Sequence, residues 1–191
     1  MGEGAGGPLA TEEPEPLAVS IRLEGPGDEA GVRAVELAAF SGPEEADIVD
    51  RIRAEAPEGW QSLVAVDGEA RIVGHLLLSP CVVEDEAGGA VATVLAIGPV
   101  AVLPDVQLRG VGSSLMYAGM SLAMARATPA LVLLGHATYY PRFGFESARE
   151  VGLQPPAEAW PDHVWLARRL PGWEESMRGI VRYPEAFGPL A

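Results

Sequence analysis

The chain has 191 residues, of which 48% are hydrophobic and 21% charged, and this composition fits one globular domain with tails. Its formal net charge of −14 argues against nucleic acid as a partner, because phosphate backbones bind clusters of Lys and Arg. No apolar run reaches the roughly 18 residues that span a bilayer. With Cys81 as the single cysteine and no signal-peptide pattern, we expect a reducing, cytoplasmic location and no membrane association.

Two residue types are absent from the sequence, and their absence limits its chemistry. The chain has no Lys and no Asn, and all 13 basic residues are Arg, a bias typical of a GC-rich bacterial genome. No lysine nucleophile, Schiff base or asparagine side chain is therefore available to a mechanism. The acidic balance favours a neutral or cationic partner only weakly, because whole-chain charge mainly affects solubility.

The N-terminal part predicts a tail, one strand and two helices. Residues 1–17 are rich in Gly, Pro and Glu, and we expect them to be disordered. Residues 18–23 alternate enough for a strand. Asp28 is a candidate cap for a helix that runs to about residue 40. Residues 44–56 form a second, amphipathic helix, which a proline ends.

Three consecutive strands with a period of two follow these helices. They cover residues 62–66, 70–83 and 90–102. Short turns that contain glycine join them, so the strands should form an antiparallel meander. The third strand contains Gly98-Pro99, and we expect a bulge or a splayed strand there because proline cannot donate to the ladder.

The second half of the chain predicts a long helix followed by short elements. These are a helix over 111–127, a buried strand over 131–134, a short helix around 138–143, and strands near 145 and over 162–167. We expect residues 18–170 to form one domain and residues 171–191 to be a loop-rich extension packed on it. The order β-α-α-β-β-β-α-β-α-β describes a meander that feeds a parallel pair, so we predict an α/β or α+β fold on a mixed sheet.

The most informative segment joins the third strand of the meander to the long helix. It has the sequence Val-Leu-Pro-Asp-Val-Gln-Leu-Arg-Gly-Val-Gly-Ser over residues 102–113. A helix N-terminus presents unpaired backbone N–H groups and partial positive charge. Gly110 and Gly112 remove Cβ atoms that would keep a phosphate away. The segment predicts a pyrophosphate site. Tyr140, 28 residues after Gly112, is expected to place its phenol close to that site.

Two other kinds of glycine-loop site do not fit this sequence. A P-loop needs Lys after its last glycine, and the chain has none. A dinucleotide-binding loop needs a third glycine near position 115, where Leu115 stands, and an acidic residue about 20 residues later, which is absent. The remaining alternative is that Gly110 and Gly112 form only a tight turn between strand and helix.

Two motifs carry a resemblance to a known family. The first motif is Val102-x-Pro104-x-x-Gln107-x-Arg109-Gly110-x-Gly112, and the second is Gly135-His136-x-x-Tyr139-Tyr140-Pro141-Arg142-Phe143-Gly144-Phe145. Over about residues 18–170 the sequence resembles the GNAT superfamily of acyl-CoA-dependent N-acyltransferases, and the second motif looks most like its YhbS-like bacterial branch. One position departs from the family pattern. Many members carry Asn at the end of the second parallel strand, where His136 is the nearest polar residue here.

The resemblance implies a fold and an activity. The fold is a twisted, mostly antiparallel sheet with a splayed parallel pair, flanked by helices. The activity is direct transfer of an acetyl group from acetyl-CoA to an amine of a small molecule or a protein, in a ternary complex. The resemblance also allows a homodimer. The alternative on the same fold is a non-catalytic acyl-CoA sensor or interaction module.

The resemblance also implies roles for particular residues. The pantetheine arm would pair with Val100, Ala101 and Val102 like an extra strand. The pyrophosphate would rest on backbone N–H groups of Leu108, Arg109, Gly110, Val111, Gly112 and Ser113. Backbone N–H groups near Gly98–Val100 would polarise the thioester carbonyl, and Tyr140 would protonate the leaving thiolate as general acid. Gln107 is expected to set the loop geometry.

Each of these residues also has a simpler structural explanation. Tyr140 could pack in an aromatic box with Phe143 and Phe145, and Tyr139 is the more obvious packing residue of the two tyrosines. Arg109 could be solvated rather than bound to phosphate. His136 could transfer protons or contact the substrate. Alternatively, it is an ordinary hydrogen-bonded histidine at the end of a strand.

The sequence leaves the general base open. Glu36, Glu44, Glu45 and His75 are all candidates, and a chain of water molecules would also serve. His75 could face the cleft from the middle of its strand. Three well-separated histidines and one cysteine predict no zinc site, and Cys81 is expected to be a small buried apolar residue.

Overall fold

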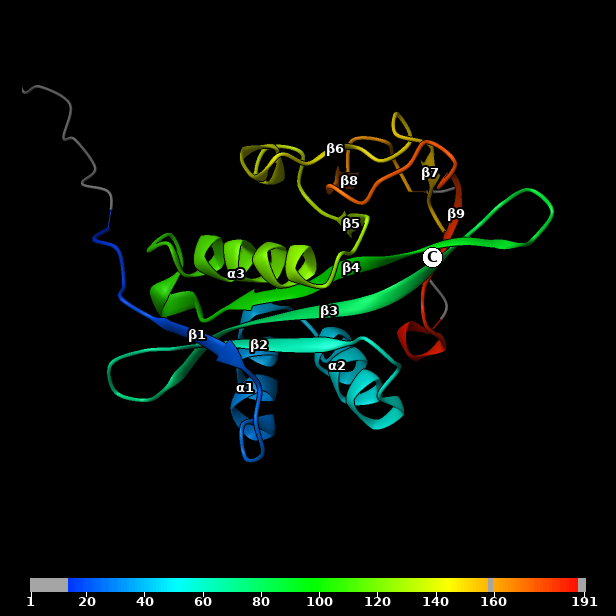
Figure 1. Cartoon of the computed structure of the whole chain (residues 1–191). Helices are drawn as coiled ribbons and strands as arrows, with labels where there is room; N and C mark the ends of the chain where they lie inside the picture. Colours follow the sequence, from blue (N-terminus) through cyan, green and yellow to red (C-terminus); the bar gives the residue numbers. More distant parts are fainter. Residues whose placement is uncertain (1–13, 158–159, 189–191) are drawn as a thin grey trace, which may run out of the picture.

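The computed structural model describes residues 14–157 and 160–188, whose strands form one twisted mixed sheet (Figure 1). The strands are β1 (Ser20–Leu23), β2 (Gln61–Val66), β3 (Ile72–Glu84), β4 (Ala90–Val102), β5 (Ala130–Leu134), β6 (Glu146–Ser147), β7 (Leu153–Gln154), β8 (Trp165–Arg169) and β9 (Gly179–Arg182). The order β1-β2-β3-β4 is antiparallel, β5 pairs with β4 in parallel, and β8 and β6 continue the sheet.

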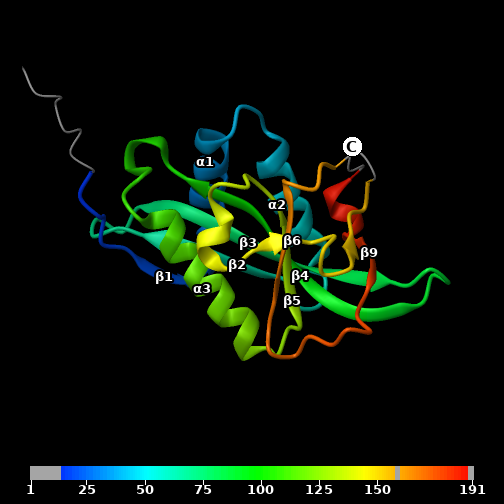
Figure 2. The same cartoon turned by 90° about the horizontal axis from the view of Figure 1, so that it is seen from above.

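Helices cover both faces of this sheet. α1 (Glu29–Ala39) and α2 (Glu44–Glu55) lie on one face, and α3 (Val111–Ala125) lies on the other (Figure 1). Seen from above, the long β3–β4 hairpin extends beyond the helices (Figure 2). No helix in the described part of the chain is long and apolar enough to cross a membrane. The short 3-10 helices are η1 (Pro104–Val106), η2 (Tyr140–Phe143) and η3 (Glu185–Phe187).

The architecture confirms the predicted antiparallel meander that feeds a parallel pair. β4 has the predicted bounds, and the three α-helices differ from prediction by two residues at most. The predicted side-chain cap of α1 is wrong in detail. The Asp28 carboxylate makes no cap hydrogen bond to the helix. It accepts one from the backbone N–H of Gly25 at 2.8 Å and pairs with Arg22.

The C-terminal part contains more strand than the sequence predicts. β8 begins at Trp165, later than the expected start at residue 162. β7 and β9 were not predicted, and β9 lies within the segment 171–191 that was expected to be loop-rich. β9 pairs with the far end of β3 and with β7, so these short strands depend on a sheet edge that is distant in sequence.

The described end of the N-terminal tail is attached to the domain. Residues 1–13 of the tail that we expected to be disordered lie outside the described residues. The backbone N–H of Leu17 donates to the carbonyl of Arg109 at 2.9 Å. In return, Nε of Arg109 donates to the carbonyl of Glu15 at 2.9 Å. The tail therefore reaches the loop before α3.

The expected irregularity at Gly98-Pro99 is a β-bulge. Leu76 pairs with Val100 and Leu78 with Ile97, so the two residues Gly98 and Pro99 stand opposite one residue of β3. The parallel pairing of β4 with β5 is confined to two positions before the bulge. Beyond it, β4 continues along β3 to Val102 while β5 diverges.

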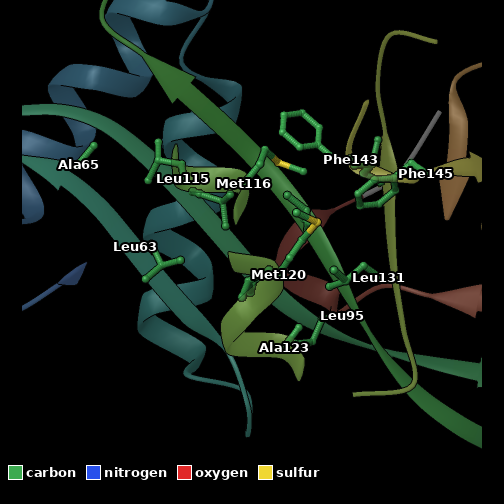
Figure 3. Packing of buried hydrophobic residues seen from close by; sticks show 14 of the residues in the cluster. Leu63, Ala65, Leu95, Leu115, Met116, Met120, Ala123, Leu131, Phe143 and Phe145 are labelled. Atoms are coloured by element: carbon green, nitrogen blue, oxygen red, sulfur yellow. The ribbon is translucent and has the colours of Figure 1, made fainter. Parts of the chain in front are cut away.

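α3 packs its apolar face on the sheet to form a continuous core (Figure 3). Leu115, Met116 and Met120 of α3 belong to one buried cluster with residues of β2, β4 and β5. Phe143 and Phe145 belong to the same cluster. The segment that carries Tyr140 is thus anchored to the core that holds α3.

Gly74 of β3 lies directly beneath α3 and provides a stability test. An added Cβ would lie 2.9 Å from Cδ1 of Leu115 and 3.0 Å from Cγ1 of Val111. We expect Gly74→Val to lower the free energy of unfolding by about 1–3 kcal/mol through overpacking. Scanning calorimetry should show a Tm lower by several degrees. Gly68→Val is the control, because nothing lies within 4 Å of a Cβ there. Equal Tm values for the two variants would contradict this packing.

Candidate active site

A cleft of about 690 Å³ lies beyond the last paired residues of β4 and β5. Its walls come from the end of α1, the end of β4, the loop and first turn of α3, and the segment after β5, so regions far apart in sequence meet there. The lining residues are Ala39, Phe40, Val100, Val102, Val106, Gln107, Leu108, Gly110, Val111, Gly112, Ser113, His136, Tyr139, Tyr140 and Arg142.

The glycine loop forms one wall of the cleft. Gly110 caps α3 with a φ of 85°, a left-handed conformation that glycine adopts without strain. A Cβ added at Gly112 would lie 3.1 Å from the hydroxyl of Tyr139, so this position also requires a missing side chain. At both glycines, therefore, no side chain covers the N-terminus of the 15-residue helix. Its backbone N–H groups and helix dipole suit a phosphate.

Most residues that the sequence suggested for cofactor binding line this cleft. Val100, Val102, Leu108, Gly110, Val111, Gly112 and Ser113 do so. Ala101 is fully buried and pairs with His75 on β3. Arg109 is absent from the lining, and its guanidinium is bound to the tail at Glu15. The predicted structural role of Gln107 agrees with its geometry, because its amide donates to the carbonyl of Val102 at 3.0 Å.

Tyr140 lines the opposite wall within a cluster of aromatic rings. Its ring centroid lies 5.0 Å from that of Tyr139 and 6.0 Å from that of Phe145. Burial, and then the neighbouring Tyr139, raises the pKa of Tyr140 to about 12. Gly135 makes room for the ring, because a Cβ there would lie 2.2 Å from Cε2 of Tyr140. Tyr140 is thus both packed and exposed to the cleft.

Two arginines hold the tyrosine segment. A guanidinium nitrogen of Arg168 donates to the carbonyl of Phe143, at the end of η2. Nε of Arg142 donates to the carbonyl of Tyr139 at 3.0 Å, and the guanidinium lies 4.6 Å from the centre of the Tyr139 ring. Arg142 also lines the cleft, and sequence reasoning gave it no role although it lies within the second motif.

The candidate proton acceptors fall into different environments. His136 is exposed and lines the cleft. Glu44 is exposed and Glu45 is half-buried on α2. His75, which the sequence left as a possible cleft residue, does not line the cleft, because it is 0% exposed and lies against the face covered by α1. The alternation of its strand could not show which face it takes.

His75 and Glu36 form a buried pair. Nδ1 of His75 lies 2.5 Å from Oε1 of Glu36, and both side chains are 0% exposed. Nε2 of His75 lies 2.8 Å from Oγ of Ser62. Burial raises the pKa of Glu36, His75 partly opposes this effect, and Glu45 adds to it. The pair is a second polar centre, separate from the lining of the cleft.

Three lining residues were not singled out in the sequence. Ala39 and Phe40 come from the end of α1, and Val106 comes from η1. Apolar residues carry no chemical signal that would select them from the sequence. The described residues contain no group of three or more His, Cys, Asp or Glu arranged to hold a metal ion.

Comparison with known proteins identifies the family. Residues 20–148 match the model of the acetyltransferase (GNAT) domain. The chain is 33% identical over 169 residues to YjhQ of Escherichia coli K12, an uncharacterized N-acetyltransferase, covering 85% of this chain and 92% of YjhQ. It is 30% identical over 172 residues to YhbS of the same strain, also an uncharacterized N-acetyltransferase, covering 87% of this chain and 97% of YhbS.

Solved structures agree with this result. The crystal structure of Escherichia coli YhbS in complex with CoA superimposes with a TM-score of 0.79 at 27% identity, over 92% of this chain and 94% of that one. A GNAT acetyltransferase from Brucella melitensis in complex with acetyl-CoA gives a TM-score of 0.71 at 30% identity, over 89% and 98% of the two chains. The matching motifs, sheet and relatives together show that this chain belongs to the GNAT family of acetyltransferases.

Proposed function

We propose that the protein is an N-acetyltransferase that moves the acetyl group of acetyl-CoA directly to an amine in a ternary complex. One observation carries the proposal. The glycine loop before α3 and the hydroxyl-bearing Tyr140 line the same cleft where β4 and β5 separate. An anion-binding helix end and a proton donor on opposite walls are the two groups that the reaction needs from the protein.

The donor would occupy the β4 side of the cleft. The backbone of Val100–Val102 lies beyond the pairing with β5, so its outer edge is available to hydrogen-bond the amide groups of a pantetheine arm. The pyrophosphate would bind the backbone N–H groups from Leu108 to Ser113. Two similar proteins support the choice of donor, since YhbS was crystallised with CoA and the Brucella protein with acetyl-CoA.

The transfer needs one bond to form and one to break. The nitrogen of the amine bonds to the thioester carbonyl carbon, the carbon–sulfur bond breaks, and the nitrogen loses a proton. Tyr140 gives its proton to the departing sulfur, so the products are an amide and the free thiol. Backbone N–H groups at the bulge near Gly98–Val100 would stabilise the negative charge that develops on the carbonyl oxygen.

The acceptor would approach from the side of α1. Ala39 and Phe40 of this side line the cleft, and His136 and the cationic Arg142 line the same cleft from the segment after β5. Apolar walls with few polar groups suit a small amine or the side chain of a protein amine, and His136 would contact its polar part.

Binding of the donor is the first test. We expect calorimetric titration with acetyl-CoA to give a micromolar Kd for the wild type. Gly110→Glu should abolish binding for two reasons. Its Cβ is strained at a left-handed backbone position, and its carboxylate repels the phosphates of the donor. Arg109→Ala should leave Kd nearly unchanged, since the guanidinium is bound to the tail. A wild type that does not bind would contradict the proposal.

Turnover tests the role of Tyr140. We expect Tyr140→Phe to bind acetyl-CoA with the wild-type Kd and to lower kcat by roughly 10²-fold or more, because the phenol supplies the proton for the thiolate. The assay follows thiol release with a panel of primary amines: an alkylamine, a polyamine, an amino sugar and a lysine-containing peptide. Tyr139→Phe is the matched control on the adjacent ring. Equal kcat values for wild type and Tyr140→Phe would exclude the general-acid role, and binding without any amine consumption would indicate a sensor.

The raised pKa of Tyr140 gives a prediction on pH. An ordinary phenol is half ionised near pH 10. Because burial raises the pKa of Tyr140 to about 12, this phenol keeps its proton at pH 10. The decrease in kcat that ionisation of Tyr140 causes therefore occurs above pH 10. Ultraviolet difference titration of wild type against Tyr140→Phe measures the ionisation. Gly135→Ala should displace the ring and move the midpoint down towards pH 10, and an ordinary midpoint in the wild type would contradict the buried geometry.

A further inference from the structure

A chain of hydrogen-bonded polar side chains runs beneath α1, on the face of the sheet opposite α3. Glu36 on α1 contacts His75 on β3, and His75 contacts Ser62 on β2. The hydroxyl of Ser62 donates to Glu24, which follows β1. Arg53 on α2 donates to the other oxygen of Glu24 at 2.7 and 3.0 Å. The members of the chain thus come from α1, β3, β2, the residue after β1, and α2.

The ion pair at the Arg53 end of the chain determines which atom donates and which accepts in each hydrogen bond. Paired with the guanidinium, Glu24 is a carboxylate and only accepts hydrogen bonds. Ser62 has one proton and donates it to Glu24, so its oxygen can only accept from Nε2–H of His75. Nδ1 of His75 is then the nitrogen that shares a proton with Glu36. The tautomer of the imidazole follows from the charge at the far end.

The two ends of the chain face different surroundings. Ala39 and Phe40 follow Glu36 by three and four positions, share its side of α1, and line the cleft. At the other end, Glu24 and Ser62 line a separate surface pocket of about 360 Å³. The chain therefore runs from a residue that neighbours the acceptor wall along α1 to a surface pocket elsewhere on the molecule.

One atom of the chain lacks a partner in the described structure. Oε2 of Glu36 is buried and accepts no hydrogen bond, although Oε1 is bound to His75. A network that only held α1 on the sheet would gain by satisfying both oxygens. Burial also raises the pKa of this carboxyl, which places its proton exchange closer to neutral pH.

We infer that this chain is the proton outlet of the acetyl transfer: Glu36 receives the proton that the acceptor amine loses, and His75, Ser62 and Glu24 conduct a proton to the surface pocket. The inference rests on the proposed function and adds the general base that the sequence left open. A water molecule between the amine and Oε2 would complete the path, because Glu36 itself is not among the residues that line the cleft.

The proton movements balance along the chain. In the resting arrangement Glu36 holds a proton toward Nδ1, Nε2–H donates to Ser62, and Ser62 donates to Glu24. A shift of all three protons one step toward Glu24 leaves Glu36 as a carboxylate and Glu24 protonated. Glu36 then takes the proton of the amine, and Glu24 releases one to solvent in the surface pocket. The imidazole then regains its first tautomer by exchange with water, which takes the proton from Nδ1 and returns one to Nε2 without net transfer, while the Ser62 hydroxyl turns back toward Glu24. Tyr140 regains its proton from solvent.

The groups that act on Glu36 come from each element packed on α1. β3 contributes His75, β4 contributes the uncharged Ala101, and α2 contributes Glu45, whose negative charge favours the protonated form of Glu36. Arg33 on α1 is engaged by Asp47 and Asp50 of α2. The pH dependence of the relay therefore belongs to Glu36, whose pKa is raised by burial, partly lowered by His75 and raised further by Glu45.

Five variants and two assays test the relay. We expect Glu36→Gln to lower kcat by at least about 10²-fold, to remove the acidic limb of the kcat profile, and to leave the Kd for acetyl-CoA unchanged. Ser62→Ala should lower kcat about tenfold, whereas Ser62→Thr, which keeps the hydroxyl, should restore most of it. Ser79→Ala is the control, because it removes a buried serine hydroxyl of β3 outside the chain and should change nothing.

The second assay needs no substrate. In protein labelled with ¹⁵N-histidine, His75 is assigned by loss of its signals in His75→Gln. We expect the Nε2–H tautomer in the wild type and in Ser62→Thr, and a shift toward the Nδ1–H tautomer in Ser62→Ala. An Nδ1–H tautomer in the wild type, or equal kcat values for Ser62→Ala and Ser62→Thr, would overturn the relay.

The outcomes separate this inference from the proposed function. A Glu36→Gln variant with wild-type kcat and an intact acidic limb would overturn only the relay. Failure of the wild type to acetylate any amine of the panel would overturn the proposed function and the relay with it. If Glu36→Gln does not fold, as judged by acetyl-CoA binding, the comparison of the two Ser62 variants still decides.

Discussion

The loss of pairing between β4 and β5 is the constraint on which the rest of the site depends. β4 keeps its ladder with β3 up to Val102, while its parallel partner leaves after Ala96. Pro99 has no N–H to donate, and Gly98 and Pro99 together occupy the place of one residue opposite β3. The bulge therefore lets one edge of β4 open without disturbing the other edge. The cleft, the glycine loop and the start of α3 all follow from this opening.

The glycine loop and the tyrosine segment, which form two walls of the cleft, are held at a fixed separation because both are anchored in one hydrophobic core. The glycine loop is fixed by α3, whose Leu115 and Met116 are buried against the sheet. The tyrosine segment is fixed by Phe143, which packs in the same cluster, and by the hydrogen bond from Arg168 to its carbonyl. A backbone anion site and a phenol are thus held at a set separation by apolar packing, which is what positions reacting groups effectively.

The sequence was informative where structure is local. The period of β4, the proline in it, and the glycines before α3 are local signals, and these elements were predicted within two residues. β9 was missed because its four residues form a strand only against the distant edge of β3. The fully buried position of His75 was missed because its partners, Glu36 and Ser62, lie 39 and 13 residues away in sequence. Alternation shows that a residue changes face, but it does not show what covers that face.

The two faces of the sheet carry different chemistry, and β4 is shared by both. On the α3 face the packing is apolar, and it orients the donor side through the glycine loop and Tyr140. On the α1 face a polar chain is buried among apolar neighbours, and such a chain is costly unless its members are satisfied. Arg53 and Glu24 satisfy one end, and Oε2 of Glu36 is left without a partner at the other, buried end. Because the unsatisfied atom lies at the buried end on α1 and not at the surface pocket, the polar chain is better explained by proton transfer than by stability.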